Sequence, residues 1–227
     1  MDYYYATPDL DAQIAEIKKK IFSSMNGVIA ENMQQNGIIY KHNFGLNLPI
    51  IKQIASEYTP NHDLAQRLWN LQIRETMLLA TLLEPTETCT RATTESWVHK
   101  VDQLELAEQT VMNLFSKLNF AAELAIDWIH SSERWTQICG YLLAARVGSR
   151  FSDKQVEWIT DRAIAQSGID EFHLYKAIAL CLSRFCRRGK STAQKLLDKT
   201  TFTTDISRSQ EIIADTVKQE IIFLDIL

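Results

Sequence analysis

Residues 64–83 read LAQRLWNLQIRETMLLATLL, and this stretch decides the fold class. Its apolar residues recur three and four positions apart, which is the spacing of one face of an α-helix. The stretch divides into residues 64–70 and 73–83, each with its own apolar face. Two short helices of this kind are stable only when they bury those faces together, so the stretch predicts a packed helix pair.

The same pattern continues on both sides of this pair. From Pro49 onward, apolar-periodic segments of roughly 10 to 18 residues alternate with short polar breaks, and the whole chain has only 7 Gly and 4 Pro. Paired helices recur at about 30 to 45 residues, the period of HEAT-type solenoids. We therefore expect an all-α, HEAT-like repeat α-solenoid, a right-handed superhelix of antiparallel helix pairs.

Local signals divide the expected single domain, residues 1–227, into three parts. Residues 1–45 form an N-terminal helical segment, with one helix from 11 to about 35 and a stripe of Ile14, Ile17, Ile21 and Val28. Residues 46–200 hold the helix pairs, and Pro49 is placed to open the first of them. Residues 201–227 form a capping helix with an apolar stripe, whose members are Ile212, Ile213, Val217, Ile221, Ile222 and Leu224.

One helix can be bounded at both ends from its capping residues. Ser152-Asp153-Lys154-Gln155 matches a capping box, and Gly168 suits a left-handed C-terminal cap. Together they predict a helix over about 153–166.

Charge is distributed unevenly along the chain. The net charge is -4, which argues against a uniformly basic nucleic-acid binder. However, residues 141–200 carry 11 Lys and Arg against 6 Asp and Glu, whereas residues 1–140 carry 11 against 17. The third quarter of the chain is therefore the segment that could attract an anionic partner.

Several classes of protein are disfavoured by what the motifs lack. The cysteines Cys89, Cys139, Cys181 and Cys186 show no CxxC spacing and the five histidines form no HxxxH, so we expect buried reduced thiols and neither metal nor cofactor. The opening residues 1–5 lack the basic segment and apolar run of a signal peptide, and no apolar run is long enough to span a bilayer. We expect a cytoplasmic protein without membrane contact.

Four segments in order resemble the DNA alkylation repair (AlkD-like) family of HEAT-like repeat DNA glycosylases, and one of them is Trp97 with residues 103–109, which fall where the family has a tryptophan followed by its catalytic segment. Residues 64–83 are similar to its LA-x-x-LW, I-x-E and LA-x-LL pattern, and residues 44–55 to its G-V-x-x-P-x-L-R-x-I-A. Residues 172–180, FHLYKAIAL, resemble its helix with a K-A-I core. The resemblance spans about residues 40–190 and marks the chain as a divergent member.

The resemblance implies a site chemistry that this chain retains only in part. The family binds duplex DNA in a concave basic groove and excises cationic alkylated purines, using a carboxylate, tryptophan faces and an arginine. On that pattern Glu108 stands at the carboxylate position, and Leu104, Ile138 and Leu180 stand where the family has two tryptophans and the arginine. Glu108 is the candidate catalytic residue, and we expect base excision to be weak or absent because an aliphatic side chain cannot attract a cationic base as an aromatic face does.

Backbone contacts to duplex or branched DNA are expected from the basic third quarter. The candidate DNA-binding residues are Lys176, Arg184, Arg187, Arg188, Lys190 and Lys195. A solvated helix end is the alternative for this run, and core anchoring is the commoner role for the five tryptophans. An alternative for the whole chain is a helical-repeat scaffold that holds a protein partner, in which the acidic first 140 residues would matter more.

Overall fold

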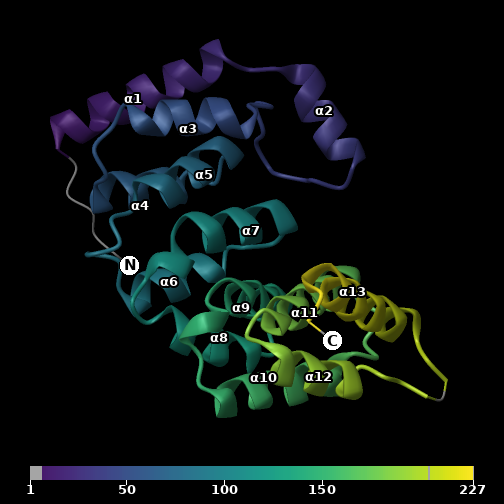
Figure 1. Ribbon diagram of the computed structural model, residues 1–227. Coiled ribbons are helices and arrows are strands. Elements are labelled where there is room, and N and C mark those ends of the chain that lie inside the picture. The colour runs from purple at the N-terminus through teal and green to yellow at the C-terminus, as the bar shows by residue number, and fades with distance from the viewer. Residues whose placement is uncertain (1–6, 204, 227) are drawn as a thin grey trace. The chain divides into compact units, whose positions relative to one another are not determined.

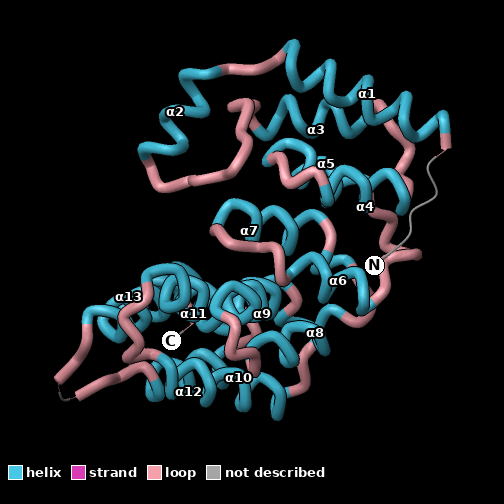
Figure 2. The backbone as a smooth tube through the Cα atoms, turned by 180° about the vertical axis from the view of Figure 1, so that it is seen from behind, coloured by secondary structure: helices cyan, strands magenta, loops and turns pink. Residues whose placement is uncertain are grey.

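The computed structural model describes residues 7–203 and 205–226. Within these ranges every regular element is a helix and none is a strand, as Figures 1 and 2 show, which confirms the all-α prediction. The chain divides into two compact units between Leu118 and Asn119. The opening residues 1–5 lie outside the described ranges. Among the described helices, none combines the length and the apolar character needed to cross a bilayer.

The first unit is built from α1 (Pro8–Ser23), α2 (Gly27–Gln35), α3 (Leu48–Ser56), α4 (His62–Asn70), α5 (Arg74–Leu83), α6 (Arg91–Val98), α7 (Leu104–Asn113) and the short 3-10 helix η1 (Phe115–Lys117). Most of these helices begin at a residue whose side-chain oxygen accepts a hydrogen bond from a backbone N–H of the first turn. These capping residues are Thr7, Asn26, Asn47, Asn61 and Thr90. Such caps satisfy N–H groups that have no partner inside the helix, so they fix where each helix starts.

Two stacked tryptophans form the centre of the first unit. Trp69 on α4 and Trp97 on α6 are fully buried, and their ring centroids lie 4.2 Å apart with the planes 5° from parallel. The indole Nε1–H of Trp97 donates to Oε1 of the buried Gln66 at 3.0 Å. The predicted helix pair of residues 64–83 is present as α4 and α5, which pack on each other.

The predicted single helix from 11 to about 35 is wrong. The chain forms α1 and α2 instead, because Asn26 leaves the helical conformation and its side chain accepts from the N–H of Ile29, which opens a second helix. Ile14, Ile17 and Ile21 are buried as predicted, but Val28 is 69% exposed. No residue of α2 is buried, and Figure 1 shows it apart from the other helices of its unit.

The second unit contains α8 (Ala121–Ile129), α9 (Arg134–Arg146), η2 (Gly148–Arg150), α10 (Asp153–Gln166), α11 (Phe172–Cys186), α12 (Lys190–Lys199) and α13 (Arg208–Leu224). Helix α11 packs between α9 and α13, and these three form one layer, with α8, α10 and α12 in a second layer (Figure 1). Gly140 lets α8 and α9 approach closely, since a Cβ there would lie 2.7 Å from the backbone nitrogen of Ile129.

Helix α10 has the predicted bounds, and both bonds of the predicted capping box at Ser152 are present. The predicted left-handed cap at Gly168 is wrong, because the backbone of Gly168 does not have a positive φ; the helix is capped at Ser167, which is right-handed and whose N–H donates to the carbonyl of Ile164. In α13, Ile213, Val217 and Ile221 are buried as predicted, whereas Ile222 is 60% exposed.

All four cysteines lie within the described residues and are buried free thiols, as predicted. Burial raises the pKa of Cys89, Cys139 and Cys186 to about 12, and it raises the pKa of Cys181 further. They serve as small apolar side chains of the core.

Candidate nucleic-acid interface

One face of α11 carries a stripe of accessible side chains. Its members are Phe172, Lys176, Leu180, Arg184 and Arg187, and they follow one another at helical spacings of four, four, four and three residues. The opposite face of the helix is core, with Leu174, Ile178, Cys181, Leu182 and Phe185 buried. Three predicted DNA-binding residues, Lys176, Arg184 and Arg187, therefore share one exposed face of the layer α9, α11 and α13.

A carboxylate from α13 faces the two arginines of this stripe. Glu220 Oε1 lies 2.6 Å from Nε of Arg187 and 3.7 Å from Nη1 of Arg184. The arginine side chains are 48% and 40% exposed, and that of Glu220 is 16% exposed. The cluster keeps a net charge of +1 when all three groups are ionised. Exposed ion pairs are worth only about 0–1 kcal/mol, so a phosphate can replace the carboxylate here.

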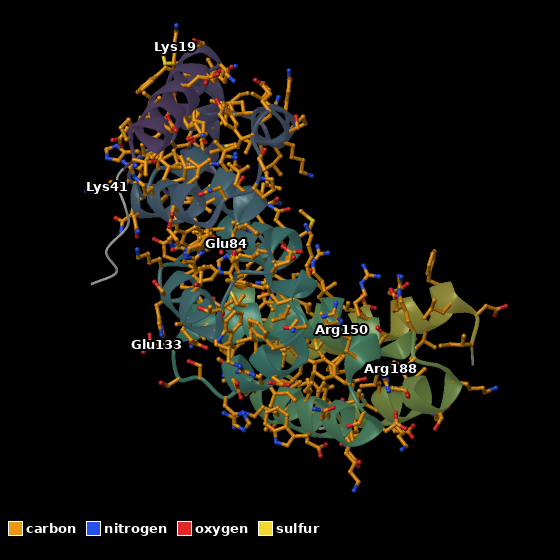
Figure 3. The ribbon with its side chains drawn as sticks, turned by 90° about the vertical axis from the view of Figure 1, so that its left-hand side faces the viewer. Lys19, Lys41, Glu84, Glu133, Arg150 and Arg188 are labelled. Atoms are coloured by element: carbon orange, nitrogen blue, oxygen red, sulfur yellow. The ribbon has the colours of Figure 1, made fainter. Side chains whose placement is uncertain are left out.

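Arg188 is occupied by contacts within the fold. Its Nη1 donates to the carbonyl of Gly148 at 2.6 Å, its Nη2 donates to Oδ1 of Asp153 at 2.8 Å, and its side chain is 19% exposed. Figure 3 shows Arg188 and Arg150 in the same region of the second unit. Arg188 ties the end of α11 to η2 and the start of α10, so its first role is structural.

Lys195 belongs to a pocket between α10 and α12, in the second layer. The pocket brings together the cations of Lys154, Arg188, Lys195 and Lys199 and the carboxylates of Asp153 and Glu157. Lys190, the first residue of α12, is exposed. The predicted basic set is therefore divided: three residues share the α11 stripe, and Arg188 and Lys195 line a pocket of mixed charge.

The positions expected for an excision site fall in both units. Leu104 and Glu108 lie on α7 of the first unit, where Leu104 is half-buried and Glu108 is exposed. Ile138 on α9 is fully buried, so it does not present its side chain to a ligand, and Leu180 is half-buried on the α11 stripe. Within residues 7–203 and 205–226, no group of three or more His, Cys, Asp or Glu could hold a metal ion.

A buried ionic network beside Glu108 was not predicted. Arg74 on α5 is 1% exposed, and its Nη2 and Nε donate to the carboxylate of Glu105 at 2.6 and 2.8 Å. Its Nη1 donates to Oε1 of Glu75 at 3.0 Å and to the carbonyl of Leu46 at 2.7 Å. Burial alone would lower the pKa of Arg74, but the hydrogen bonds and charge of Glu105, with the charge of Glu75, raise it.

This network also holds the loop between α2 and α3. Glu75 is fully buried and accepts from the backbone N–H groups of Phe44 and Leu46. The hydroxyl of Tyr40 donates to Glu105 Oε2 at 3.0 Å, and burial followed by the charge of Glu105 raises the pKa of Tyr40. An arginine and a tyrosine thus contact Glu105, one turn before Glu108 on the same helix.

The tryptophans divide into core and accessible groups. Trp69, Trp97 and Trp128 are buried, as expected of core anchors. Trp135, at the start of α9, and Trp158, on α10, are half-buried. Each of these two lies against a histidine: Trp158 stacks on His130 at 4.3 Å, and Trp135 is tilted against His173 at 5.1 Å.

A family model described as DNA alkylation repair enzyme matches residues 17–210, which is most of the chain. The chain belongs to this family. The family match extends well beyond the 40–190 range of the resemblance. It confirms the recognition made from residues 44–55, 64–83 and 172–180.

A solved structure from a new family of proteins related to the HEAT-like repeat DNA glycosylases, with affinity for branched DNA structures, is similar in fold. It is 14% identical, with a TM-score of 0.79, over 93% of this chain and 95% of the other. This likeness confirms the HEAT-like repeat fold. Among curated proteins none matches this chain.

The resemblance assigns the excision site of this family to positions 104, 108, 138 and 180. These positions hold Leu104, Glu108, Ile138 and Leu180, and their assignment to that site stays a prediction. Lys176, Arg184 and Arg187 lie on the same stripe of α11 as Leu180.

Proposed function

We propose that this chain is a DNA-binding member of the DNA alkylation repair enzyme family in which base excision is weak or absent. The observation that carries the proposal is the exposed α11 stripe, where Lys176, Arg184 and Arg187 share one face. Cations on one face can follow a phosphate backbone, and such contacts need no base-specific chemistry. The affinity of the structural relative for branched DNA supports duplex or branched DNA as the ligand.

The loss of excision follows from the chemistry of the substituted positions. A cationic base gains roughly 0.5–2 kcal/mol from an aromatic face, and leucine at 104 and 180 offers none. Ile138 supplies no charge and is buried. Glu108 alone could stabilise a developing sugar cation, but nothing at the aligned positions would hold the damaged nucleotide beside it.

Binding is tested with a labelled duplex and a three-way junction of matched length, titrated at several salt concentrations. We expect saturable binding, and we expect the logarithm of the association constant to fall linearly with the logarithm of the salt concentration. A slope near zero, or no binding to either DNA at low salt, would contradict the proposal.

Base release from methylated duplex DNA tests the catalytic part. We expect the wild-type chain and Glu108→Gln to release methylated purine at the same rate, within about a factor of two of the uncatalysed reaction. A matched family enzyme that retains both tryptophans serves as the positive control. If the wild type releases methylated purine and Glu108→Gln abolishes that release, the chain is an active glycosylase and this part of the proposal is wrong.

Glu220→Gln should strengthen DNA binding by about two- to tenfold. The substitution keeps the shape of the side chain but frees Arg184 and Arg187 from an ion pair worth about 0–1 kcal/mol each, and it raises the local charge. The control is Glu211→Gln, an exposed glutamate on the same helix, which makes the same change in net charge. Equal effects of the two variants in a fluorescence anisotropy titration would show that only net charge matters.

The alternative function, a helical-repeat scaffold for a protein partner, draws support from the first unit. Phe22, Met25, Val28 and Ile39 are 52%, 63%, 69% and 66% exposed, at or near α2. Accessible apolar side chains that gather around one helix are typical of a protein-binding surface. Absence of DNA binding, together with capture of a defined partner that Val28→Asp abolishes, would favour the scaffold.

A further inference from the structure

Aromatic side chains gather where α9 and α11 begin. We call Trp135, Phe172 and His173 the aromatic ledge. The ring centroids of Trp135 and His173 lie 5.1 Å apart, and those of Phe172 and His173 lie 5.3 Å apart with the planes nearly perpendicular. Phe172 also meets the buried Tyr175 edge-on at 5.6 Å, so the ledge is anchored to the core of the second unit.

The ledge is accessible to a ligand. Phe172 is 55% exposed, the side chain of His173 is 36% exposed, and Trp135 is half-buried. Ile169, just before α11, is 40% exposed and extends the apolar surface. A large aromatic side chain that is left more than half exposed forgoes hydrophobic burial, and exposed apolar side chains that lie together mark a candidate binding surface.

Glu171 holds the ledge in place. Its carboxylate accepts from the backbone N–H groups of His173 and Leu174 at 3.2 and 2.6 Å, which caps α11, and it lies 3.3 Å from Nδ1 of His173. Arg134 Nη1 approaches the same carboxylate at 3.4 Å. The start of α11 and the ring of His173 are therefore fixed before any ligand arrives, which reduces the entropy lost on binding.

Charge differs between the two ends of the α11 stripe. Near the ledge stand the carboxylates of Glu133, Asp170 and Glu171, with Arg134 and Lys176 as the cations. The other end carries Arg184 and Arg187 with one carboxylate, Glu220. The ledge end therefore suits a flat, uncharged ring, and the arginine end suits phosphate.

We propose that the aromatic ledge stacks an unpaired base of a branched or single-stranded DNA whose backbone runs along α11 to Arg184 and Arg187. This inference rests on the proposed function and names the structure of the DNA that the same face selects. Aromatic rings beside a cationic track are the general means by which proteins hold single strands without reading their sequence. Lys176, whose Nζ lies 5.9 Å from the centroid of Phe172, would turn from the ring to the phosphate of the stacked nucleotide.

The length of the stripe sets the length of strand that can use both ends. From Phe172 to Arg184 the helix rises by about 18 Å, at 1.5 Å per residue. A strand that keeps the 3.4 Å spacing of a duplex covers this in about five nucleotides, and an extended strand in fewer. A single-stranded arm of five or more nucleotides should therefore reach the ledge, and a one-nucleotide arm should not.

The test compares a blunt duplex with the same duplex carrying a single-stranded arm of one, three, five or eight nucleotides, with 2-aminopurine in the arm. We expect the wild type to gain about five- to a hundredfold in affinity as the arm reaches the ledge, the range for stacking one base on an aromatic ring. Quenching of the 2-aminopurine should appear at the same arm length. Phe172→Ala and Trp135→Leu should remove both effects, so that each variant binds the armed duplexes no more tightly than it binds the blunt duplex.

Trp158→Leu is the matched control. Trp158 is another half-buried tryptophan, on α10 of the second layer, and it stacks on His130 at the end of α8. Phe172→Ala removes a side chain that is more than half exposed, so a folded variant is expected, and thermal unfolding checks it. If the wild type and both ledge variants bind the DNA with a single-stranded arm equally well, stacking on the ledge is refuted, whereas the proposed function is not. No binding of any DNA by the wild type would overturn both.

Discussion

Arg74→Ala should lower the free energy of unfolding by about 3–5 kcal/mol, the cost of removing one partner from a buried ion pair. The substitution leaves the carboxylates of Glu75 and Glu105 without their cation, and these side chains are only 0% and 14% exposed. It also removes the donor to the carbonyl of Leu46, so the loop that precedes α3 loses an anchor. Urea denaturation followed by circular dichroism measures the change.

The control for this variant is Arg67→Ala, since Arg67 pairs with Asp11 in a setting where the side chains are 24% and 56% exposed. An accessible pair of that kind should cost no more than about 1 kcal/mol. If uncompensated charge is the cause, adding Glu105→Gln to Arg74→Ala should restore part of the loss, because it removes one of the two stranded charges. Equal losses for Arg74→Ala and Arg67→Ala would refute this account of the network.

Replacing both Arg184 and Arg187 by glutamine should weaken duplex or junction binding by at least about tenfold at low salt, since each charge-assisted hydrogen bond is worth about 1.5–3 kcal/mol. The salt slope should fall by about 0.9 for each phosphate that the variant no longer neutralises. Glutamine is preferred to glutamate here because Glu220 already stands beside both positions. Arg188 is left unchanged because its bonds to Gly148 and Asp153 would confound binding with stability.

A variant of the second layer separates the two candidate faces. Lys154→Gln with Lys195→Gln makes the same change in charge at the pocket between α10 and α12. We expect it to alter affinity by less than about threefold, as a general effect of net charge. If this pair weakens binding more than the arginine pair does, the DNA lies against the pocket and the α11 stripe is not the interface.

The fold followed from local pattern because most helices are indicated twice, by period and by cap. The apolar spacing in residues 64–83 and the capping box at Ser152 each depend only on residues close together in the sequence. The helical conformation of those residues can therefore be predicted from the sequence itself. The error at residues 11–35 has the same origin. The apolar period runs through Asn26, and only the hydrogen bond that its side-chain oxygen accepts from the N–H of Ile29 shows that a new helix begins there.

The site was less accessible to sequence reasoning because it depends on which residues share a face across several helices. Lys176, Arg184 and Arg187 could be grouped from their spacing on one helix. The pairing of Arg184 and Arg187 with Glu220, 33 residues beyond Arg187, could not. Arg74 and Glu75 were visible as charges inside an apolar run, which is the one signal in the sequence that a buried network was present.

The burial of the thiols has a consequence for a protein of this family. Sulfur reacts with electrophiles as the thiolate, and a thiol with a pKa near 12 is almost wholly protonated at neutral pH. Cys89, Cys139 and Cys186 are in that state, and the pKa of Cys181 is raised still further. These four cysteines therefore offer almost no thiolate at neutral pH to a methylating agent of the kind that attacks the ring nitrogens of purines.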